Sequence, residues 1–267
     1  MSLQDVHQLN DEARKVFAPA SAFSWNLVST RRTQFQYFDE LLGQPNWKGR
    51  KILDFGGNIG TFLDSAGENV DHADYWCVDI NPAVIAQGRL LFPRAHFVHF
   101  NRYNSQYNPH GIRHLPIPDC GVKFDFIFAF SVFTHVDEKE MVELVGSLRR
   151  MLADDGVLAF TFLEPHYDRS LSDPALPRGS TVITNLGSRR SDDPVRHARW
   201  FVLIDNHQLF LEPGDALCHQ TRAGKPLESF VSFFTARHML SLFPGATVHA
   251  PVQRDWQHCC VLRNSQT

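Results

Sequence analysis

Short apolar runs recur along the chain from Lys51 to Glu164, separated by polar stretches that contain glycine, proline or asparagine. The runs "KILDF", "DYWCVDI", "HFVHF", "FDFIFAF" and "VLAFTFLE" predict five strands. The fourth run is apolar at nearly every position, which is typical of a parallel strand buried on both faces. A long polar loop, 101–122, precedes it.

Helical patterns fill most of the intervals between these strands. "IGTFLDSA" predicts a short helix that ends at Gly67, and Asn81 followed by Pro82 marks the start of a second helix. A third helix begins at Asp137, three residues before a glutamate, and we expect it to end at Gly156. Strands that alternate with helices predict an α/β fold, a doubly wound Rossmann-like sheet with right-handed crossovers.

The two ends of the chain depart from this alternation. Residues 3–17 and 29–43 are predicted to be helices. In the second, the apolar side chains that fall on one side are Phe35, Phe38, Leu41 and Leu42. Near the C-terminus, "TARHMLSLF" predicts a helix, followed by two strands, "ATVHAPV" and "HCCVLRN". Because no helix separates these two strands, we expect them to pair antiparallel.

These patterns divide the chain into three parts. Residues 1–48 form a helical N-terminal cap, 49–164 and 230–267 form the α/β core, and 165–229 form an insertion after the fifth strand. The insertion is rich in Pro, Gly, Ser and Asp and contains an expected hairpin, "WFVLIDNHQLFLE". Ligands of open α/β sheets bind beyond the carboxyl ends of the strands, so the insertion is placed to cover a binding site.

The composition of the chain mainly excludes classes of partner. The 267 residues carry a formal net charge of −3 and their basic pairs are scattered, which argues against a nucleic-acid partner. No apolar run approaches the roughly 18 residues that span a bilayer, so no membrane association is expected. The five cysteines follow no repeated spacing, and we expect reduced thiols and a cytoplasmic location.

The stretch "LDFGGNIG" places three glycines between the first strand and its helix. It is either a tight turn without a ligand or a turn that brings the backbone close to one. A dinucleotide fingerprint would need glycines where the chain has Asn58 and Thr61, and no Lys-Ser or Lys-Thr follows as in a P-loop. Asp54 lies before the glycines and Asp79 ends the next strand, where its carboxylate can accept hydrogen bonds from two ribose hydroxyls. Two acids and a bare turn suit a ligand with a ribose and positive charge, such as S-adenosylmethionine.

"ILDFGGNIG", "CVDINP", "FDFIFAFSVFTHV" and "LADDGVLAFTFLEP" resemble, in order and spacing, the successive motifs of class I S-adenosylmethionine-dependent methyltransferases. The similarity covers 49–165, and more loosely the C-terminal helix and strand pair. It implies a seven-stranded sheet with an antiparallel last strand. One departure from the family's D-x-G-x-G-x-G pattern is Asn58, which stands in place of the middle glycine.

The resemblance implies that S-adenosyl-L-methionine is the cofactor and indicates which residues surround it. The glycine turn would contact the methionine portion, the end of the second strand would contact the ribose and adenine, and the end of the fourth strand would lie beside the cofactor. The implied residues are Asp54, Gly56, Gly57, Asn58, Gly60, Asp79, Ile80, Asn101, Phe130 and Ser131. Arg31 or Arg32 is a further candidate for the cofactor carboxylate, although an exposed arginine pair is more often only solvated.

Methyl transfer requires alignment of the acceptor and, for a hydroxyl acceptor, removal of a proton. His135 in "SVFTHVDE" is the first candidate base, because histidine titrates near neutral pH. It could instead shape the pocket without transferring a proton. His166 and Tyr167, directly after the fifth strand, are the second candidates.

No metal site is expected. His96 and His99 lie on a predicted strand, where residues three apart face opposite sides. His110 and His114 lie on either side of a glycine in a loop.

The leading functional hypothesis is a methyltransferase that acts on oxygen or nitrogen of a small-molecule acceptor in secondary metabolism. The aromatic side chains and balanced charge of 165–229 favour an apolar pocket over a nucleic-acid surface. The alternative is a degenerate protein of the same fold that binds the cofactor but acts as a structural partner or catalyses another reaction. The acceptor and the oligomeric state are left open.

Overall fold

The computed structural model describes residues 33–105, 107–167, 181–185, 202–204, 217–220, 230–251 and 257–264. The predicted helix 3–17 and most of the predicted N-terminal cap lie outside these ranges. The chain divides into two compact units, Met1–Asn101 and Arg102–Thr267, which are described in turn.

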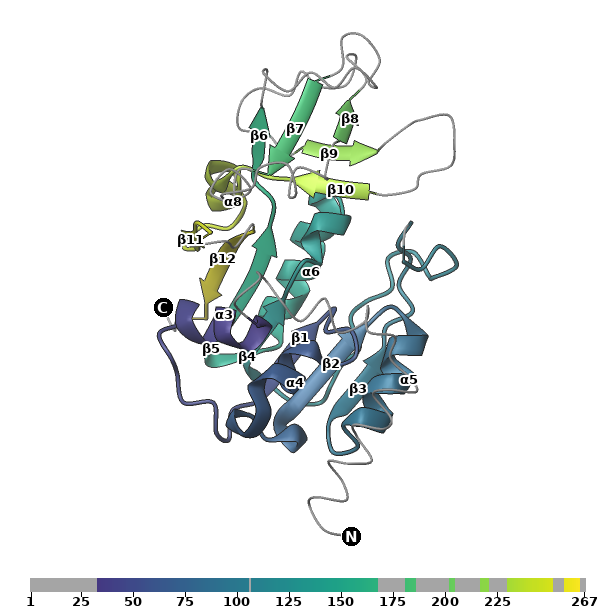
Figure 1. Ribbon diagram of the computed structural model, residues 1–267, viewed down its shortest axis with the longest axis vertical. Coiled ribbons are helices and arrows are strands. Elements are labelled where there is room, and N and C mark those ends of the chain that lie inside the picture. Colours follow the sequence, from purple (N-terminus) through teal and green to yellow (C-terminus); the bar gives the residue numbers. More distant parts are fainter. Residues whose placement is uncertain are drawn as a thin grey trace. The chain divides into compact units, whose positions relative to one another are not determined.

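Unit 1 contains three parallel strands with helices between them (Figure 1, purple to blue). Strand β1 pairs with β2, and β2 pairs with β3, in both cases parallel. The elements are α3 (Gln34–Leu41), β1 (Ile52–Phe55), α4 (Thr61–Ala66), η2 (Gly67–Asn69), η3 (His72–Asp74), β2 (Tyr75–Asp79), α5 (Pro82–Leu91) and β3 (His96–His99). The predicted strands of this region, the Asn81 cap and the end of α4 at Gly67 are confirmed.

The helix predicted at 29–43 is shorter than expected, because α3 begins only at Gln34. Thr33 has an extended backbone and its side chain accepts a hydrogen bond from the backbone N–H of Gln36, while the Gln36 side chain accepts from the Thr33 N–H. This capping box fixes the start of the helix. The buried face is also shifted toward its beginning, with Phe35 and Phe38 buried as expected but Leu41 partly exposed.

An aromatic cluster holds α3 and α4 against the strands of unit 1. Phe62 is fully buried, and its ring lies 5.6 Å from that of Phe35, 5.9 Å from that of Trp47 and 6.4 Å from that of Tyr75. Rings at these separations pack with favourable quadrupole interactions in addition to burying apolar area. The helix that follows the glycine turn is thus packed against the core of unit 1.

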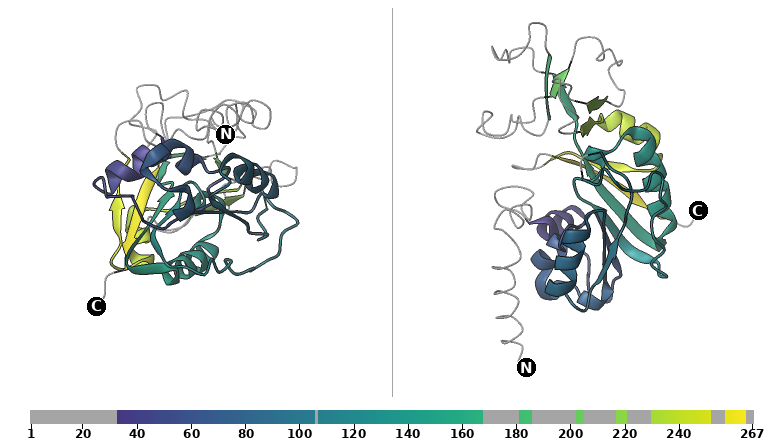
Figure 2. Two further views of the ribbon diagram at one scale, coloured as in Figure 1. Left: turned by 90° about the horizontal axis from the view of Figure 1, so that it is seen from below. Right: turned by 90° about the vertical axis from the view of Figure 1, so that its right-hand side faces the viewer.

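Unit 2 contains the remaining strands of the main sheet and its longest helix (Figures 1 and 2, teal to yellow). Strand β4 is parallel to β5, whereas β12 is antiparallel to both β5 and β11. The elements are β4 (Phe124–Ala129), η4 (Phe133–His135), α6 (Glu138–Arg150), β5 (Leu152–Phe162), α8 (Ala236–Leu242), β11 (Thr247–His249) and β12 (His258–Arg263).

The strand order is β11-β12-β5-β4-β1-β2-β3, a seven-stranded sheet. Its last strand along the chain, β12, is the antiparallel one. The predicted fold class, a Rossmann-like α/β sheet with an antiparallel last strand, is confirmed.

The boundary between α6 and β5 was predicted wrongly. The helix ends at Arg150 and β5 begins at Leu152, so Gly156 lies inside the strand instead of ending the helix. The pairing of β4 with β5 shifts register between Phe124 and Phe126. A Cβ at Gly156 would lie 2.8 Å from the Phe124 carbonyl oxygen, so glycine is required here by a close backbone approach.

In the described parts of the chain between β5 and α8 there are five short strands. β6 (Pro165–Tyr167), β7 (Thr181–Asn185) and β8 (Val202–Ile204) form an antiparallel sheet in that order, and β9 (Leu217–Gln220) pairs antiparallel with β10 (Phe230–Phe233). Strand β8 corresponds to the first strand of the predicted hairpin, and it pairs with β7. The turn and second arm of that hairpin lie outside the described residues.

Candidate functional site

The turn between β1 and α4 enters the left-handed region of backbone conformation three times. The angle φ is 76° at Gly56, 56° at Asn58 and 89° at Gly60. Glycine adopts these angles without strain, and asparagine is one of the few other residues that tolerate them. Gly57 is needed for a different reason, since a Cβ there would lie 2.5 Å from Cγ of Asp54. The backbone geometry therefore explains the residue types of this turn.

Asp79 joins the glycine turn to the end of β2. One carboxylate oxygen accepts a hydrogen bond from the Asn58 N–H at 3.0 Å, and the other accepts from the Asn81 N–H at 2.8 Å. Burial raises the pKa of Asp79, and the backbone hydrogen bonds oppose that rise. A carboxylate has about four acceptor positions. Asp79 can therefore hold the turn and still accept hydrogen bonds from two adjacent hydroxyl groups.

Asp54 lies beneath the turn. Its side chain is 1% exposed, and the Tyr75 hydroxyl donates a hydrogen bond to it at 2.6 Å. Burial raises the pKa of Asp54 from 3.8 to about 7, although the hydrogen bond from Tyr75 lowers it in part. Asp54 therefore supports the turn from the core side, and a direct cofactor contact for it stays a prediction.

The other residues predicted around the cofactor in unit 1 lie near the strand ends. The Ile80 carbonyl oxygen lies 3.2 Å from Nε2 of His99, and the Asn101 side chain is exposed. Asn58 has a buried side-chain oxygen, Oδ1, that has no hydrogen-bond partner among the described residues. That oxygen is an acceptor available to a ligand.

In unit 2, Ser131 follows β4 with a left-handed backbone, φ 57°. Its N–H donates to the Thr161 hydroxyl at 2.7 Å, and the Thr134 hydroxyl donates to its carbonyl oxygen at 3.0 Å. Phe130 is partly exposed beside it. A left-handed serine held by two hydrogen bonds is the kind of strained position that clusters at ligand sites.

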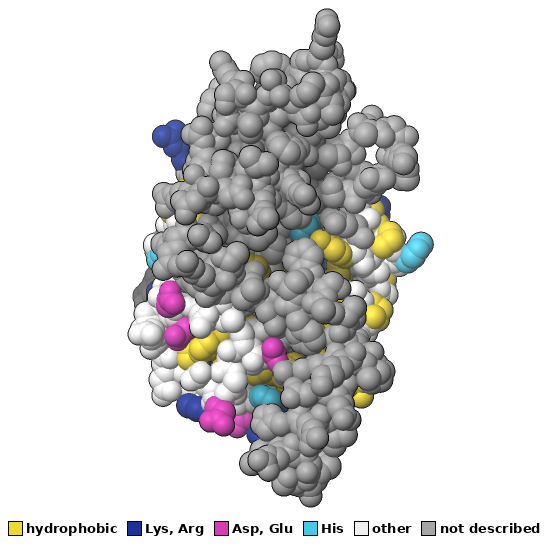
Figure 3. All heavy atoms as spheres, in the orientation of Figure 1, with side chains coloured by type: hydrophobic (Ala, Val, Ile, Leu, Met, Phe, Trp, Pro, Cys, Tyr) yellow, Lys and Arg dark blue, Asp and Glu magenta, His cyan; other side chains and the backbone are white. Residues whose placement is uncertain are grey.

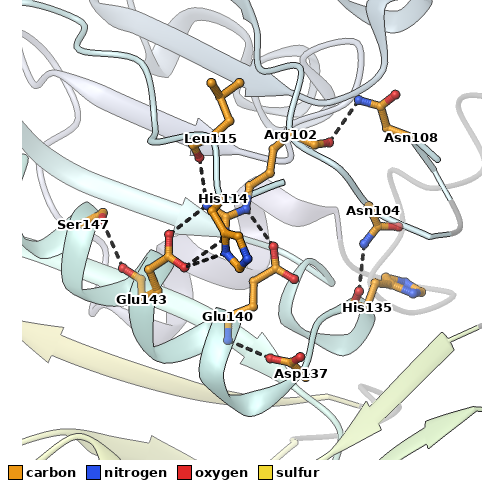
Figure 4. A network of polar contacts seen from close by, with 10 residues as sticks. All are labelled: Arg102, Asn104, Asn108, His114, Leu115, His135, Asp137, Glu140, Glu143 and Ser147. Atoms are coloured by element: carbon orange, nitrogen blue, oxygen red, sulfur yellow. Dashed lines mark hydrogen bonds and ion pairs between the residues drawn. The ribbon is translucent and has the colours of Figure 1, made fainter. Parts of the chain in front are cut away.

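His135, the first candidate base, ends η4 on the wall of a pocket of about 350 Å³ in unit 2. Its ring meets that of Tyr107 edge-on, with centroids 5.0 Å apart, and the Tyr107 hydroxyl lies 3.4 Å from Nε2. The Asn104 side chain donates to the His135 carbonyl oxygen at 2.9 Å (Figure 4). The loop 102–115 thus fixes the position of His135.

A buried arginine anchors that loop to α6. Arg102 is 4% exposed and donates to Glu140 at 2.7 Å, to Glu143 at 2.9 and 3.1 Å, and to the Leu115 carbonyl oxygen at 2.8 Å (Figure 4). The hydrogen bonds from Arg102 lower the pKa of Glu143. Burial opposes the charge of Arg102, but the two glutamates outweigh it and raise the pKa of the guanidinium. Both shifts favour the charged forms of Arg102 and Glu143.

The second candidate bases are described only in their backbone. His166 pairs with Thr184, and Tyr167 with Ile183, in the β6–β7 ladder. Arg31 and Arg32 lie outside the described residues.

Three further observations concern partners and metals. No group of three or more potential metal ligands occurs in the part of the chain that the structure describes. Within the same part, no helix is both long and apolar enough to cross a membrane. On the one face drawn in Figure 3, both acidic and basic side chains of the described residues are visible.

Four residues that matter in this geometry were not singled out from the sequence: Tyr75, Arg102, Tyr107 and Gln257. Arg102 directly follows the candidate Asn101, but its partners are 38 and 41 residues further along the chain. Tyr75 looks like any apolar strand residue in "DYWCVDI". No local pattern marks such long-range partners.

The comparisons with known proteins bear on the class of protein. Residues 53–158 match a family model described as a methyltransferase domain. This segment runs from β1 into β5 and contains the glycine turn, Asp79 and His135. None of the curated proteins matches the sequence. The match over this segment, which is less than half of the chain, agrees with the resemblance to class I methyltransferases.

Several solved structures are similar to this chain. A S-adenosylmethionine-dependent methyltransferase from Clostridium acetobutylicum ATCC 824 is 9% identical with a TM-score of 0.51, covering 97% of this chain and 99% of that one. DesVI of Streptomyces venezuelae is 14% identical with a TM-score of 0.47, covering 100% and 99%. CalS10, an amino pentose methyltransferase from Micromonospora echinaspora involved in calicheamicin biosynthesis, is 14% identical with a TM-score of 0.45, covering 98% and 91%. The first of these shows that the fold is that of S-adenosylmethionine-dependent methyltransferases.

Proposed function

We propose that the protein is a S-adenosylmethionine-dependent methyltransferase that acts on oxygen or nitrogen of a small-molecule acceptor in secondary metabolism. The observation that carries this proposal is the Asp79 carboxylate, held by two backbone N–H groups at the mouth of the glycine turn. When bound, the cofactor supplies a methyl group that is already activated on a sulfonium.

The residues of the turn fit the donor groups of this cofactor. The spare acceptor positions of Asp79 suit the two ribose hydroxyls. The buried Oδ1 of Asn58, unpaired among the described residues, suits a further N–H or O–H donor. Gly56, Asn58 and Gly60 hold the left-handed conformations that open the turn to a ligand.

The pocket beside His135 supports a small polar acceptor. Its volume of about 350 Å³ is in the range of small-molecule sites. Arg113 and Lys139 line it together with Asp137 and Glu140, so charges of both signs are present. We assign His135 the role of general base for a hydroxyl acceptor, oriented by its contacts with Tyr107 and Asn104.

We also place this activity in the cytoplasm. Four cysteines, Cys77, Cys120, Cys259 and Cys260, are free thiols. Reduced thiols are usual in that compartment.

The experiment is a calorimetric titration of the protein and of Asp79→Ala and Asp79→Asn variants with S-adenosylmethionine and S-adenosylhomocysteine. We expect tight binding by the unmodified protein, at least tenfold weaker binding by Asp79→Ala and an intermediate loss in Asp79→Asn, which keeps one acceptor oxygen. Asp74→Ala, on the nearby η3, is the matched control and should bind normally. NAD serves as the ligand control.

The outcomes separate the parts of the proposal. If the unmodified protein binds neither cofactor form, the proposed function is wrong. Normal affinity in Asp79→Ala would show that the ribose does not lie at Asp79. Cofactor binding without methyl transfer to a broad set of phenols and amines would favour the alternative, a degenerate protein of this fold.

A further inference from the structure

A cluster of polar side chains surrounds Ser131 at the carboxyl end of β4. The members besides Ser131 are Thr134, Thr161 and Gln257. Thr134 and Thr161 are 2% and 0% exposed, and Gln257 is 8% exposed. The cluster brings together the ends of β4 and β5 and the residue before β12. Ligands of open α/β sheets bind at this edge.

Gln257 completes the cluster but uses only one end of its side-chain amide. Its Nε2 donates to the Ser131 hydroxyl at 3.1 Å. Its Oε1 is buried and has no hydrogen-bond partner among the described residues. Folded proteins pair nearly all such atoms, because a buried acceptor without a donor loses its hydration and gains nothing in return. An unpaired buried amide oxygen is therefore a sign of a ligand group that pairs with it.

The backbone that follows this amide is fixed. The next residue, His258, donates from Nε2 to Glu164 at 2.8 Å, and the other Glu164 oxygen accepts from the Ala236 N–H at 2.9 Å. Burial raises the pKa of Glu164, but these two hydrogen bonds outweigh it and lower the pKa. His258 also pairs with Phe162 in the β12–β5 ladder. Gln257 is therefore held in place and does not need to move to present its oxygen.

The backbone of Ser131 adopts a conformation that is unfavourable for most residues. Its φ of 57° is unusual for a residue other than glycine, and the Thr161 and Thr134 hydroxyls hold it there. Three polar side chains thus contact a serine whose backbone is strained.

We propose that the Ser131–Gln257 pair is a hydrogen-bond acceptor site, in which Oε1 of Gln257 accepts from an N–H or O–H group of a molecule bound for methyl transfer. This inference rests on the proposed function and adds to it a recognition residue, Gln257. The donor belongs either to the α-ammonium of the cofactor or to the nucleophilic group of the acceptor. Either group would donate a hydrogen bond to the amide oxygen.

The test compares Gln257→Met, which removes the acceptor, with Gln257→Glu, which keeps an acceptor oxygen. In the first arm, calorimetry measures S-adenosylmethionine, S-adenosylhomocysteine and 5′-methylthioadenosine, which lacks the amino-acid portion. If the cofactor ammonium is the donor, Gln257→Met weakens the first two at least fivefold and leaves the third unchanged, and Gln257→Glu restores affinity.

In the second arm, formation of S-adenosylhomocysteine is followed with glucosamine, tyramine and catechol as acceptor probes. If the acceptor group is the donor, Gln257→Met raises KM for a probe at least fivefold while cofactor affinity stays unchanged, and Gln257→Glu restores it for an amine. Gln34→Met is the matched control, because Gln34 is also buried but its oxygen is paired with the Thr61 hydroxyl at 3.0 Å. Gln34→Met should not change the relative affinities for the three cofactor ligands. It should also leave the ratio of the KM for an acceptor probe to the KM for S-adenosylmethionine unchanged.

The inference is overturned if Gln257→Met changes neither cofactor affinity nor the kinetics with any probe. It is also overturned if all three cofactor ligands weaken equally, since the amide then acts through the fold. Failure of the proposed function has a different signature, namely the absence of S-adenosylmethionine binding by the unmodified protein.

Discussion

Each of the two units buries an ionisable side chain, but the two side chains have different partners in place of the water that they lose. In unit 1 the carboxyl of Asp54 is 1% exposed, and the neutral phenol of Tyr75 donates a hydrogen bond to it. In unit 2 the guanidinium of Arg102 is 4% exposed and meets two carboxylates, Glu140 and Glu143. The pKa of Asp54 is raised to about 7, whereas that of Glu143 is lowered.

The difference shows that burial alone does not decide the charge of a group. A buried carboxyl beside a neutral donor gains its proton near neutral pH, because the charged form is poorly solvated. A buried cation between two partly exposed carboxylates keeps its charge, because hydrogen bonds and opposite charge replace the lost water. We expect the glycine turn to respond to pH and the Arg102 network to be insensitive to it in the same range.

The largest expected effect is the pH dependence of stability that Asp54 causes. Because its pKa in the folded protein is raised above 3.8 to about 7, its contribution to stability is fully present below pH 3.8 and is lost as the pH rises to about 7. Asp54→Asn removes this titration. The stability of the variant relative to the unmodified protein should therefore increase by up to about 4 kcal/mol between pH 4 and pH 8. Urea unfolding at a series of pH values measures it.

Asp71→Asn is the control for this experiment. The hydrogen bond from the Ala73 N–H, more than the charge of Arg94, lowers the pKa of Asp71, so its contribution has the opposite sign. The stability of Asp71→Asn relative to the unmodified protein should decrease as the pH rises through the acid range. Equal pH profiles for Asp54→Asn and the unmodified protein would show that Asp54 is ionised in the fold.

The second effect is the loss of the buried cation in unit 2. Arg102→Met keeps the apolar stem but removes the guanidinium that binds both Glu140 and Glu143, and it leaves the Leu115 carbonyl oxygen without this donor. We expect a loss of about 3 kcal/mol in the free energy of unfolding at pH 7. Arg94→Met is the matched control, because the Arg94–Asp71 pair has side chains 66% and 46% exposed. It should cost less than about 1 kcal/mol. Similar losses in both variants would mean that burial adds nothing to the Arg102 network.

The sequence predicted well those features that depend on local chemistry. The strands of both units, the Asn81–Pro82 helix start and the antiparallel pairing of the last two strands follow from apolar periodicity and capping residues. The glycine turn was recognisable because its left-handed angles restrict the residue types. The family resemblance then assigned a role to Asp79 that agrees with its place beside the turn.

Features that depend on partners distant in the sequence could not be predicted. The end of α6 was placed at Gly156 because glycine usually ends a helix, but β4 recruits the segment from Leu152 onward into β5. The hydrogen bond from Tyr75 to the buried Asp54 joins residues that lie 21 positions apart, and it was not predicted. The two glutamate partners of Arg102 and the serine partner of Gln257 lie 38 to 126 residues away. No periodicity or motif encodes such pairings.

The smallest expected effect concerns Asn58, which buries a neutral polar atom where Asp54 and Arg102 bury ionisable groups. Its side-chain oxygen is buried and unpaired among the described residues, and its backbone has a φ of 56°. Asn58→Gly keeps the backbone hydrogen bond to Asp79. It removes the unpaired buried oxygen and the backbone strain at this φ, so we expect a gain of about 0.5 kcal/mol in the free energy of unfolding. Asn69→Gly is the control and should be destabilised, because its side chain donates to the Ala66 carbonyl oxygen at 2.9 Å. If the Asn58 oxygen also accepts from the cofactor, Asn58→Gly will bind S-adenosylmethionine several-fold more weakly while it unfolds at higher urea. A loss of stability instead would show that the Asn58 side chain supports the turn.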